Sequence, residues 1–129
     1  MNKEWQAATK QGNLEKIRLL LEQGVDINAK DRYGQTALMN AAHAGQLAPV
    51  RLLIEKGADL NVTAKYNLSA LMLALIAGHT EVAQLLIEAG ADVNIQSSRN
   101  FYGKTALFLA EHGGHSDIAA LLRQKGAAS

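Results

Sequence analysis

The segment "EHGGHSD" gathers the residue types that metal binding and acid–base catalysis use most. Glu111, His112, His115 and Asp117 are close in sequence, and their side chains can ligate a metal or transfer a proton. Two adjacent glycines in the middle of the segment make a poor rigid platform for either task.

An internal repeat accounts for these residues in another way. Gly12, Gly45 and Gly78 lie 33 residues apart, and Gly114 follows after 36. Other residues keep the same steps, namely Gly24, Gly57, Gly90 and Gly126, and the leucine pairs 19–20, 52–53, 85–86 and 121–122. So many positions in one register indicate four copies of a structural unit.

In this register the candidate cluster occupies ordinary helix positions. His115 takes the slot of Asn13, Gln46 and His79, just before a second helix. Asp117 corresponds to Glu15 and Glu81 in the first turn of two other copies, where a carboxylate interacts favourably with the helix dipole. We therefore expect no metal site.

Other catalytic motifs are missing from the sequence. No serine has histidine and acidic neighbours in a suggestive arrangement, and the glycines follow the repeat rather than a phosphate-binding motif. The chain contains no cysteine, which excludes disulfides, thiolate metal sites and a cysteine nucleophile. We expect no enzymatic activity and no cofactor.

Composition suits one soluble domain. Of 129 residues, 48% are hydrophobic, and the net charge of +1 by itself predicts neither nucleic acid nor membrane as a partner. Apolar runs such as "ALMLALIAG" are shorter than the roughly 20 residues of a membrane span, and "MNKEWQAATKQG" lacks the apolar stretch of a signal peptide. We expect a cytoplasmic monomer without membrane attachment.

Each unit has the pattern of helix, turn, helix and extended loop. "TALMNAAHAG" begins with a hydroxyl residue that can cap a helix and ends at Gly45, which can adopt the left-handed conformation. "LAPVRLLIEKG" then predicts a second helix with Pro49 in its first turn, where a missing N–H does little harm. Gly34 and Gly103 suit tight turns in the loops, and Asn67 fills the same slot.

These residues resemble the ankyrin repeat along the whole chain. "DRYGQTALMNAAHAGQLAPVRLLIEKGADLN" and "GHTEVAQLLIEAGADVN" are similar to the family pattern of about 33 residues. The resemblance implies an all-α ankyrin-repeat solenoid of stacked helix-turn-helix units with β-turn fingers, in one domain spanning residues 1–129. Its units are 1–30, 31–63, 64–96 and 97–129, of which the first and last act as caps.

The chain departs from the family pattern at several positions. Alanine replaces the usual proline at 37, 70 and 106, and Met39, Met72 and Phe108 replace the usual histidine. We expect hydrophobic contact to replace the hydrogen bonds of that histidine between repeats. Asn40 stands where the other copies have Leu73 and Leu109, so we expect a polar core residue with a backbone partner.

The fingers carry the residues that the repeat leaves free. Four of the six aromatic residues lie there, including all three tyrosines at one shared slot. Tyrosine offers a large contact area with a polar end and is enriched in recognition surfaces. The candidate binding residues of the fingers are Arg32, Tyr33, Gln35, Lys65, Tyr66, Leu68, Arg99, Phe101, Tyr102 and Lys104. The alternative is that each aromatic ring packs on the neighbouring finger.

Charge and length distinguish the fingers further. Five basic residues stand against one acid, Asp31, a balance of +4 that leaves the rest of the chain at −3. The third finger is three residues longer, and the surplus falls between Asn94 and Phe101, where added length costs folding little. We expect the longer finger to present Arg99, Phe101 and Tyr102 as the principal contact.

A protein-binding module without catalysis is the predicted function. His43, Ile76 and His112 align on the first helices, where the family's inner, concave surface lies, and they would extend the contact surface of the fingers. A basic, aromatic ridge suits a partner protein with an acidic surface. The alternative is a single strand of nucleic acid, with bases stacked on the tyrosines.

Overall fold

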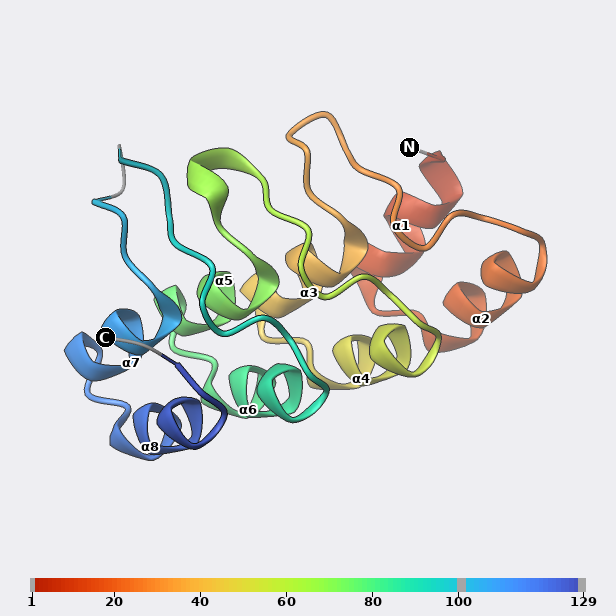
Figure 1. The fold of residues 1–129 in the computed structure, drawn as a ribbon. Coiled ribbons are helices and arrows are strands. Elements are labelled where there is room, and N and C mark those ends of the chain that lie inside the picture. Colours follow the sequence, from red (N-terminus) through yellow and green to blue (C-terminus); the bar gives the residue numbers. More distant parts are fainter. Residues whose placement is uncertain (1, 100–101, 128–129) are drawn as a thin grey trace.

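The computed structural model describes residues 2–99 and 102–127. These residues form eight α-helices and one short 3-10 helix: α1 (Lys3–Gln11), α2 (Leu14–Glu22), α3 (Ala37–Ala44), α4 (Leu47–Glu55), η1 (Lys65–Asn67), α5 (Ala70–Ile76), α6 (Thr80–Glu88), α7 (Ala106–His112) and α8 (Ser116–Gln124). One helix pair falls in each of the four expected units (Figure 1). The all-α solenoid that the sequence predicts is confirmed.

The expected caps set the bounds of the first helices. Thr36 Oγ1 accepts from the N–H of Met39 at 3.3 Å, and the hydroxyls of Ser69 and Thr105 do the same at α5 and α7. Gly45 ends α3 with φ of 72°, in the left-handed region that is common at helix C-termini and that glycine adopts without strain. Local sequence therefore sets where α3, α5 and α7 begin.

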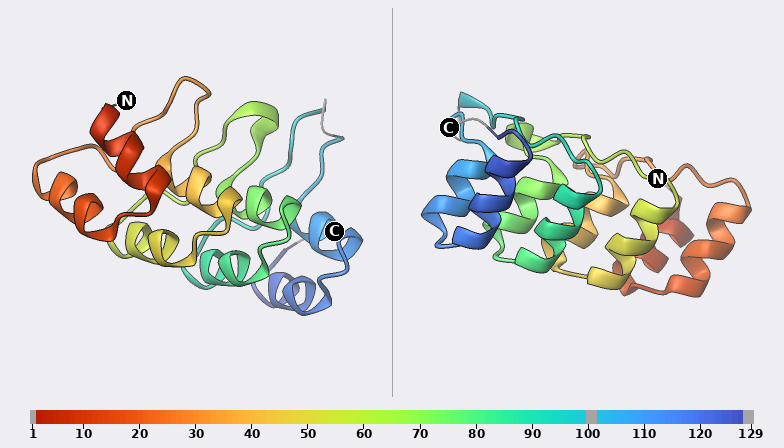
Figure 2. Two further views of the ribbon diagram at one scale, coloured as in Figure 1. Left: turned by 180° about the vertical axis from the view of Figure 1, so that it is seen from behind. Right: turned by 60° about the horizontal axis from the view of Figure 1, so that its bottom comes forward.

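The helices form two layers around a continuous apolar core. The inner layer contains α1, α3, α5 and α7, and the outer layer contains α2, α4, α6 and α8 (Figure 2, left). Met39 and Met72, which replace the family's histidine, are 1% exposed within this core. Hydrophobic contact therefore fills the place of the missing histidine, as expected. Among the described residues, the main helix contacts are within a unit and between neighbouring units.

Three fingers connect successive helix pairs and project together from one side of the stack (Figure 1). We define finger 1 as residues 28–36, finger 2 as 61–69 and finger 3 as 94–105. The asparagine at the base of each finger bonds the next repeat. Asn28 Oδ1 accepts from Asp59 N–H at 2.8 Å, Asn61 Oδ1 accepts from Asp92 N–H at 2.7 Å, and Asn94 Nδ2 donates to Gly126 O at 3.3 Å.

A backbone hydrogen bond closes the neck of each finger. The N–H of Asp31 donates to Gln35 O at 2.9 Å, and that of Ala64 donates to Leu68 O at 3.2 Å. In finger 3 the corresponding bond runs from Ser97 N–H to Lys104 O at 2.8 Å. The three surplus residues therefore lie beyond this neck, within 98–103.

The helices of the described residues are short, and the longest have nine residues. Within residues 2–99 and 102–127, no helix has the length and apolar character that crossing a bilayer requires.

Candidate binding surface

One tyrosine is exposed at the tip of each finger. The exposed fractions are 65% for Tyr33, 37% for Tyr66 and 82% for Tyr102. The three tyrosines come from the same slot of successive repeats, and the fingers that carry them project from one side of the stack (Figure 1). Large apolar rings with no role in the core are available here for contact.

A basic side chain lies against the ring in the first two fingers. The Arg32 guanidinium carbon is 4.9 Å from the centroid of the Tyr33 ring, and Nη2 donates to the Tyr33 hydroxyl at 2.8 Å. Lys65 Nζ is 5.0 Å from the centroid of the Tyr66 ring. Exposed cation–π pairs of this kind contribute about 0.5–1 kcal/mol. The tips of fingers 1 and 2 therefore each present a pair of a cation and an aromatic ring.

Two of the tyrosines adopt a strained backbone conformation. Tyr66 has φ of 64° and Tyr102 has φ of 66°, in the left-handed region that bulky residues rarely adopt. Such residues cost on the order of 1–3 kcal/mol and persist where surrounding bonds fix them. Finger 3 supplies those bonds for Tyr66, because Ser98 N–H donates to Tyr66 O at 2.7 Å and Gln96 O accepts from Asn67 Nδ2 at 2.8 Å.

Ser97 belongs to the neck of finger 3 and not to its surplus tip. Its side chain is 5% exposed, and Oγ accepts from Lys104 N–H at 2.6 Å in addition to the backbone bond of the neck. Arg99 and Tyr102 are exposed beyond the neck. Phe101, the third expected contact of this finger, lies outside the described residues.

Leu68 is not the exposed binding residue that the sequence predicted. It is 7% exposed and belongs to the core, because the residue after the turn points back toward the helices. The two residues at the same slot, Gln35 and Lys104, are half-buried for the same reason. The slot at the neck therefore supports the finger, while the tip slots face solvent.

The inner helices add an exposed row below the fingers. His43 on α3, Ile76 on α5 and His112 on α7 are all exposed, and Ile76 is 42% exposed. A branched apolar side chain open to solvent on the inner layer suits contact with a partner.

Lys104 and His112 have a packing role on α7. Lys104 Nζ lies 4.1 Å from the centroid of the Phe108 ring. His112 stacks on the same ring, with centroids 3.7 Å apart and planes 24° apart. Its Nδ1 also lies 3.0 Å from Phe108 O. Both side chains therefore stabilise the last repeat, which reduces their availability for a partner.

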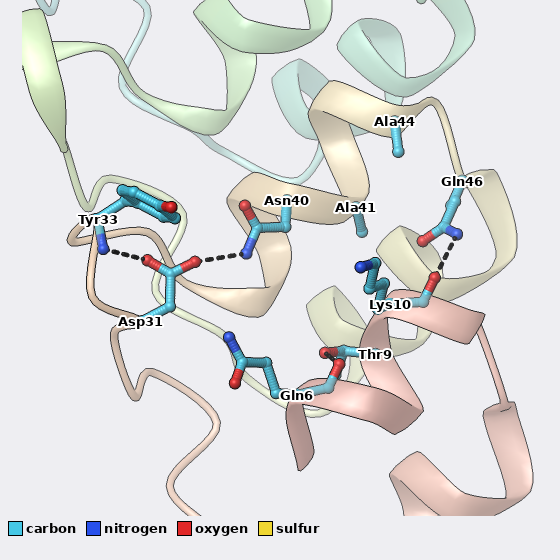
Figure 3. Close-up of a pocket in the computed structure, with 9 residues that line it drawn as sticks. All are labelled: Gln6, Thr9, Lys10, Asp31, Tyr33, Asn40, Ala41, Ala44 and Gln46. Atoms are coloured by element: carbon cyan, nitrogen blue, oxygen red, sulfur yellow. Dashed lines mark hydrogen bonds between the residues drawn. The ribbon is translucent and has the colours of Figure 1, made fainter. Parts of the chain in front are cut away.

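A groove that the sequence did not predict lies at the base of finger 1. It has a volume of about 320 Å³. Residues of α1, finger 1, α3 and the turn after α3 line it: Gln6, Thr9, Lys10, Asp31, Tyr33, Asn40, Ala41, Ala44 and Gln46 (Figure 3). The sequence signal was Asn40, a polar residue at a slot that holds leucine in the other copies.

Asn40 is exposed rather than a polar residue of the core, and its partner is a side chain rather than the backbone. Nδ2 donates to Asp31 Oδ2 at 3.2 Å across the groove (Figure 3). Partial burial alone would raise the pKa of the Asp31 carboxyl. The hydrogen bonds from Gln35 N–H, the Asn40 amide and Tyr33 N–H, together with the Arg32 charge, outweigh burial and hold that pKa below its ordinary value. Asp31 is therefore ionised at neutral pH.

The side chains of "EHGGHSD" contact different parts of the structure and do not converge on one site. Glu111 pairs with Arg123 on α8, and the His115 ring packs against Gly113. Within the described ranges, no three side chains of histidine, cysteine, aspartate or glutamate gather where they could hold a metal.

The family model for ankyrin repeats matches three copies, over residues 5–97 and 64–129. The chain belongs to the ankyrin repeat family. No curated protein matched the sequence. Ankyrin repeats generally act as protein–protein interaction modules and are typically non-catalytic. The geometry of the fingers therefore has to indicate what this ankyrin-repeat chain binds.

Proposed function

We propose that this ankyrin-repeat chain is a non-catalytic module that binds a partner protein through its finger tips and inner helices. The row of exposed tyrosines, one to each finger, is the observation that carries the proposal. Exposed aromatic side chains held by a rigid scaffold give contact area at low entropic cost. The proposed contact residues are Arg32, Tyr33, Gln35, His43, Lys65, Tyr66, Ile76, Arg99, Phe101, Tyr102, Lys104 and His112.

Backbone strain at the tips supports a binding role for the tyrosines. At the slot of Tyr66 and Tyr102, an asparagine or glycine would satisfy the left-handed turn at lower cost. Folding alone gives no reason to retain a large ring there. A contact in which the ring is buried by a partner supplies that reason.

The charge of the fingers favours a partner with an acidic surface. The fingers contain five basic residues and one acidic residue, and the basic side chains beside Tyr33 and Tyr66 are exposed. Complementary charge speeds encounter and orients the partner, whereas buried aromatic anchors supply most of the affinity.

The test compares a tip variant with a matched control on the outer layer. Immobilised wild type, Tyr33→Ala/Tyr66→Ala/Tyr102→Ala and Leu19→Ala are incubated with an extract of the source organism, and bound proteins are quantified by mass spectrometry. Leu19 on α2 is 45% exposed, so its removal also deletes exposed apolar surface. The recovered partner is then purified, and its affinity for each form is measured by calorimetry.

We expect the triple variant to lose at least about 1–3 kcal/mol of binding free energy, the range of an interface anchor, and Leu19→Ala to bind as wild type. Circular dichroism checks that all three forms are folded. Equal affinity of the triple variant and wild type would overturn the proposal. The extract could instead yield single-stranded nucleic acid whose affinity falls steeply with salt concentration. That result would favour nucleic acid, and not a protein, as the ligand of the basic, aromatic fingers.

A further inference from the structure

The groove at the base of finger 1 contains the one acid of the three fingers. Asp31 faces the groove, beside the Tyr33 ring and across from Asn40 (Figure 3). The equivalent slots hold Ala64 in finger 2 and Ser97 in finger 3. A cation that approaches the otherwise basic ridge therefore has one favourable place to bind.

The carboxylate of Asp31 is held rigidly and retains bonding capacity. Oδ1 accepts from the N–H groups of Tyr33 and Gln35, at 2.9 and 3.0 Å. Oδ2 accepts from Asn40 Nδ2 and, among the described residues, from no other donor. A carboxylate oxygen can accept two hydrogen bonds, so Oδ2 can take a further donor from the groove side.

We propose that this groove takes a basic side chain of the partner protein, with its ammonium or guanidinium group on Asp31 Oδ2 and beside the Tyr33 ring. The inference rests on the proposed function, because it assigns the chemistry of one contact within the same surface. A hydrogen bond between a cation and a carboxylate is among the stronger polar contacts, and an aromatic ring favours a cation nearby.

The size of the groove fits one side chain. Its volume of about 320 Å³ lies at the low end of the range for small-molecule sites, which is roughly 300–1,000 Å³. Ala41 and Ala44 leave room on the α3 wall for an aliphatic stem.

The two ends of the groove differ in charge, because Lys10 lies at the end opposite Asp31. Gln46 Nε2 donates to Lys10 O at 3.2 Å and ties this end to the start of α4 (Figure 3). The Lys10 ammonium repels a second cation, so the basic group of the guest lies at the Asp31 end. A carbonyl or carboxylate oxygen of the partner faces Lys10.

A peptide library displayed on phage tests the assignment even before the partner is identified. It is selected in parallel on wild type, Asp31→Asn, Asn40→Leu and Asp59→Asn. Asparagine at 31 keeps an oxygen for the two backbone N–H groups, and Asn40→Leu installs the residue that Leu73 represents in the next repeat. Asp59 is an exposed acid whose Oδ1 caps a turn away from the groove, so Asp59→Asn is the control.

Wild type and Asp59→Asn should enrich peptides with lysine or arginine at one fixed position. Binding of these peptides should fall roughly 10- to 100-fold in Asp31→Asn, the loss expected when a charge-assisted hydrogen bond is removed. It should also fall in Asn40→Leu, because Asp31 Oδ2 loses the donor that holds it in place and an apolar side chain replaces a polar one on the groove wall. Should Asp31→Asn fail to fold, Asn40→Leu carries the test. The selection could yield peptides whose binding requires the three finger tyrosines but which share no lysine or arginine position. That result would overturn the assignment of the groove and leave the proposed function standing. Failure to recover any tyrosine-dependent binder would overturn the proposed function as well.

Discussion

Two glycines at the same slot of neighbouring repeats differ in what surrounds them. Gly45 has φ of 72°, and a Cβ added there would lie 2.6 Å from the nearest atoms of the His79 ring. Gly78 has φ of 80°, and its added Cβ would meet nothing within 4 Å. Both positions favour glycine for the backbone, but only the first also needs its small size, because the His79 ring of the following repeat packs there.

The two alanine variants separate these effects. Gly78→Ala should lower the free energy of unfolding by about 1–2 kcal/mol, the cost of a left-handed conformation for a residue with a Cβ. Gly45→Ala should lose about 1–3 kcal/mol more, because the His79 ring must move. Chemical denaturation with both variants measures the difference. Equal losses would contradict a close contact between Gly45 and His79.

The repeat predicted the positions of some individual side chains correctly and those of others incorrectly. The register placed Thr36 as a helix cap and Tyr33 on a finger, because both depend on local sequence. It failed for Leu68 and Asn40, whose burial depends on which way a side chain points in three dimensions. The bond between Asn40 and Asp31 joins a helix to a finger, and periodicity carries no information on such contacts.

Finger 3 combines a hydrogen-bonded neck with a longer tip. Ser97 and Lys104 close the neck, and the surplus length lies beyond them. The sequence located the insertion in this finger, but it could not separate the neck from the tip, since a serine in a polar loop gives no sign of burial. The structure thus divides the segment into parts with different expected roles.

Two variants of finger 3 should have opposite effects. Replacing residues 98–103 by Lys-Tyr-Asn, the tip of finger 2, keeps the neck. It should change the free energy of unfolding by less than about 1.5 kcal/mol while binding weakens by about 1–3 kcal/mol. Ser97→Ala should instead lower stability by about 1–3 kcal/mol, because Lys104 N–H loses a buried acceptor, and leave affinity unchanged.

Thermal denaturation and calorimetry with the recovered partner measure both quantities. A large stability loss in the short-tip variant would show that the added length serves the fold. Unchanged affinity in that variant would show that finger 3 is not a principal contact.

The molecule as a whole is polarised between its fingers and its helices. The fingers carry a balance of +4 and the rest of the chain carries −3. Asn28 and Asn61 link each repeat to the next, so the spacing of the fingers is fixed by the stack. A partner therefore meets a rigid row of tips on one side, with the outer helices directed away from it (Figure 2, right).

Amide hydrogen exchange of the free and partner-bound protein tests the central claim most directly. We expect binding to slow exchange in the three fingers and in the inner helices α3, α5 and α7, because a bound surface opens less often and excludes solvent. Exchange in the outer helices α2, α4, α6 and α8 should stay as in the free protein. Slowed exchange confined to the outer helices, with the fingers unaffected, would contradict the account.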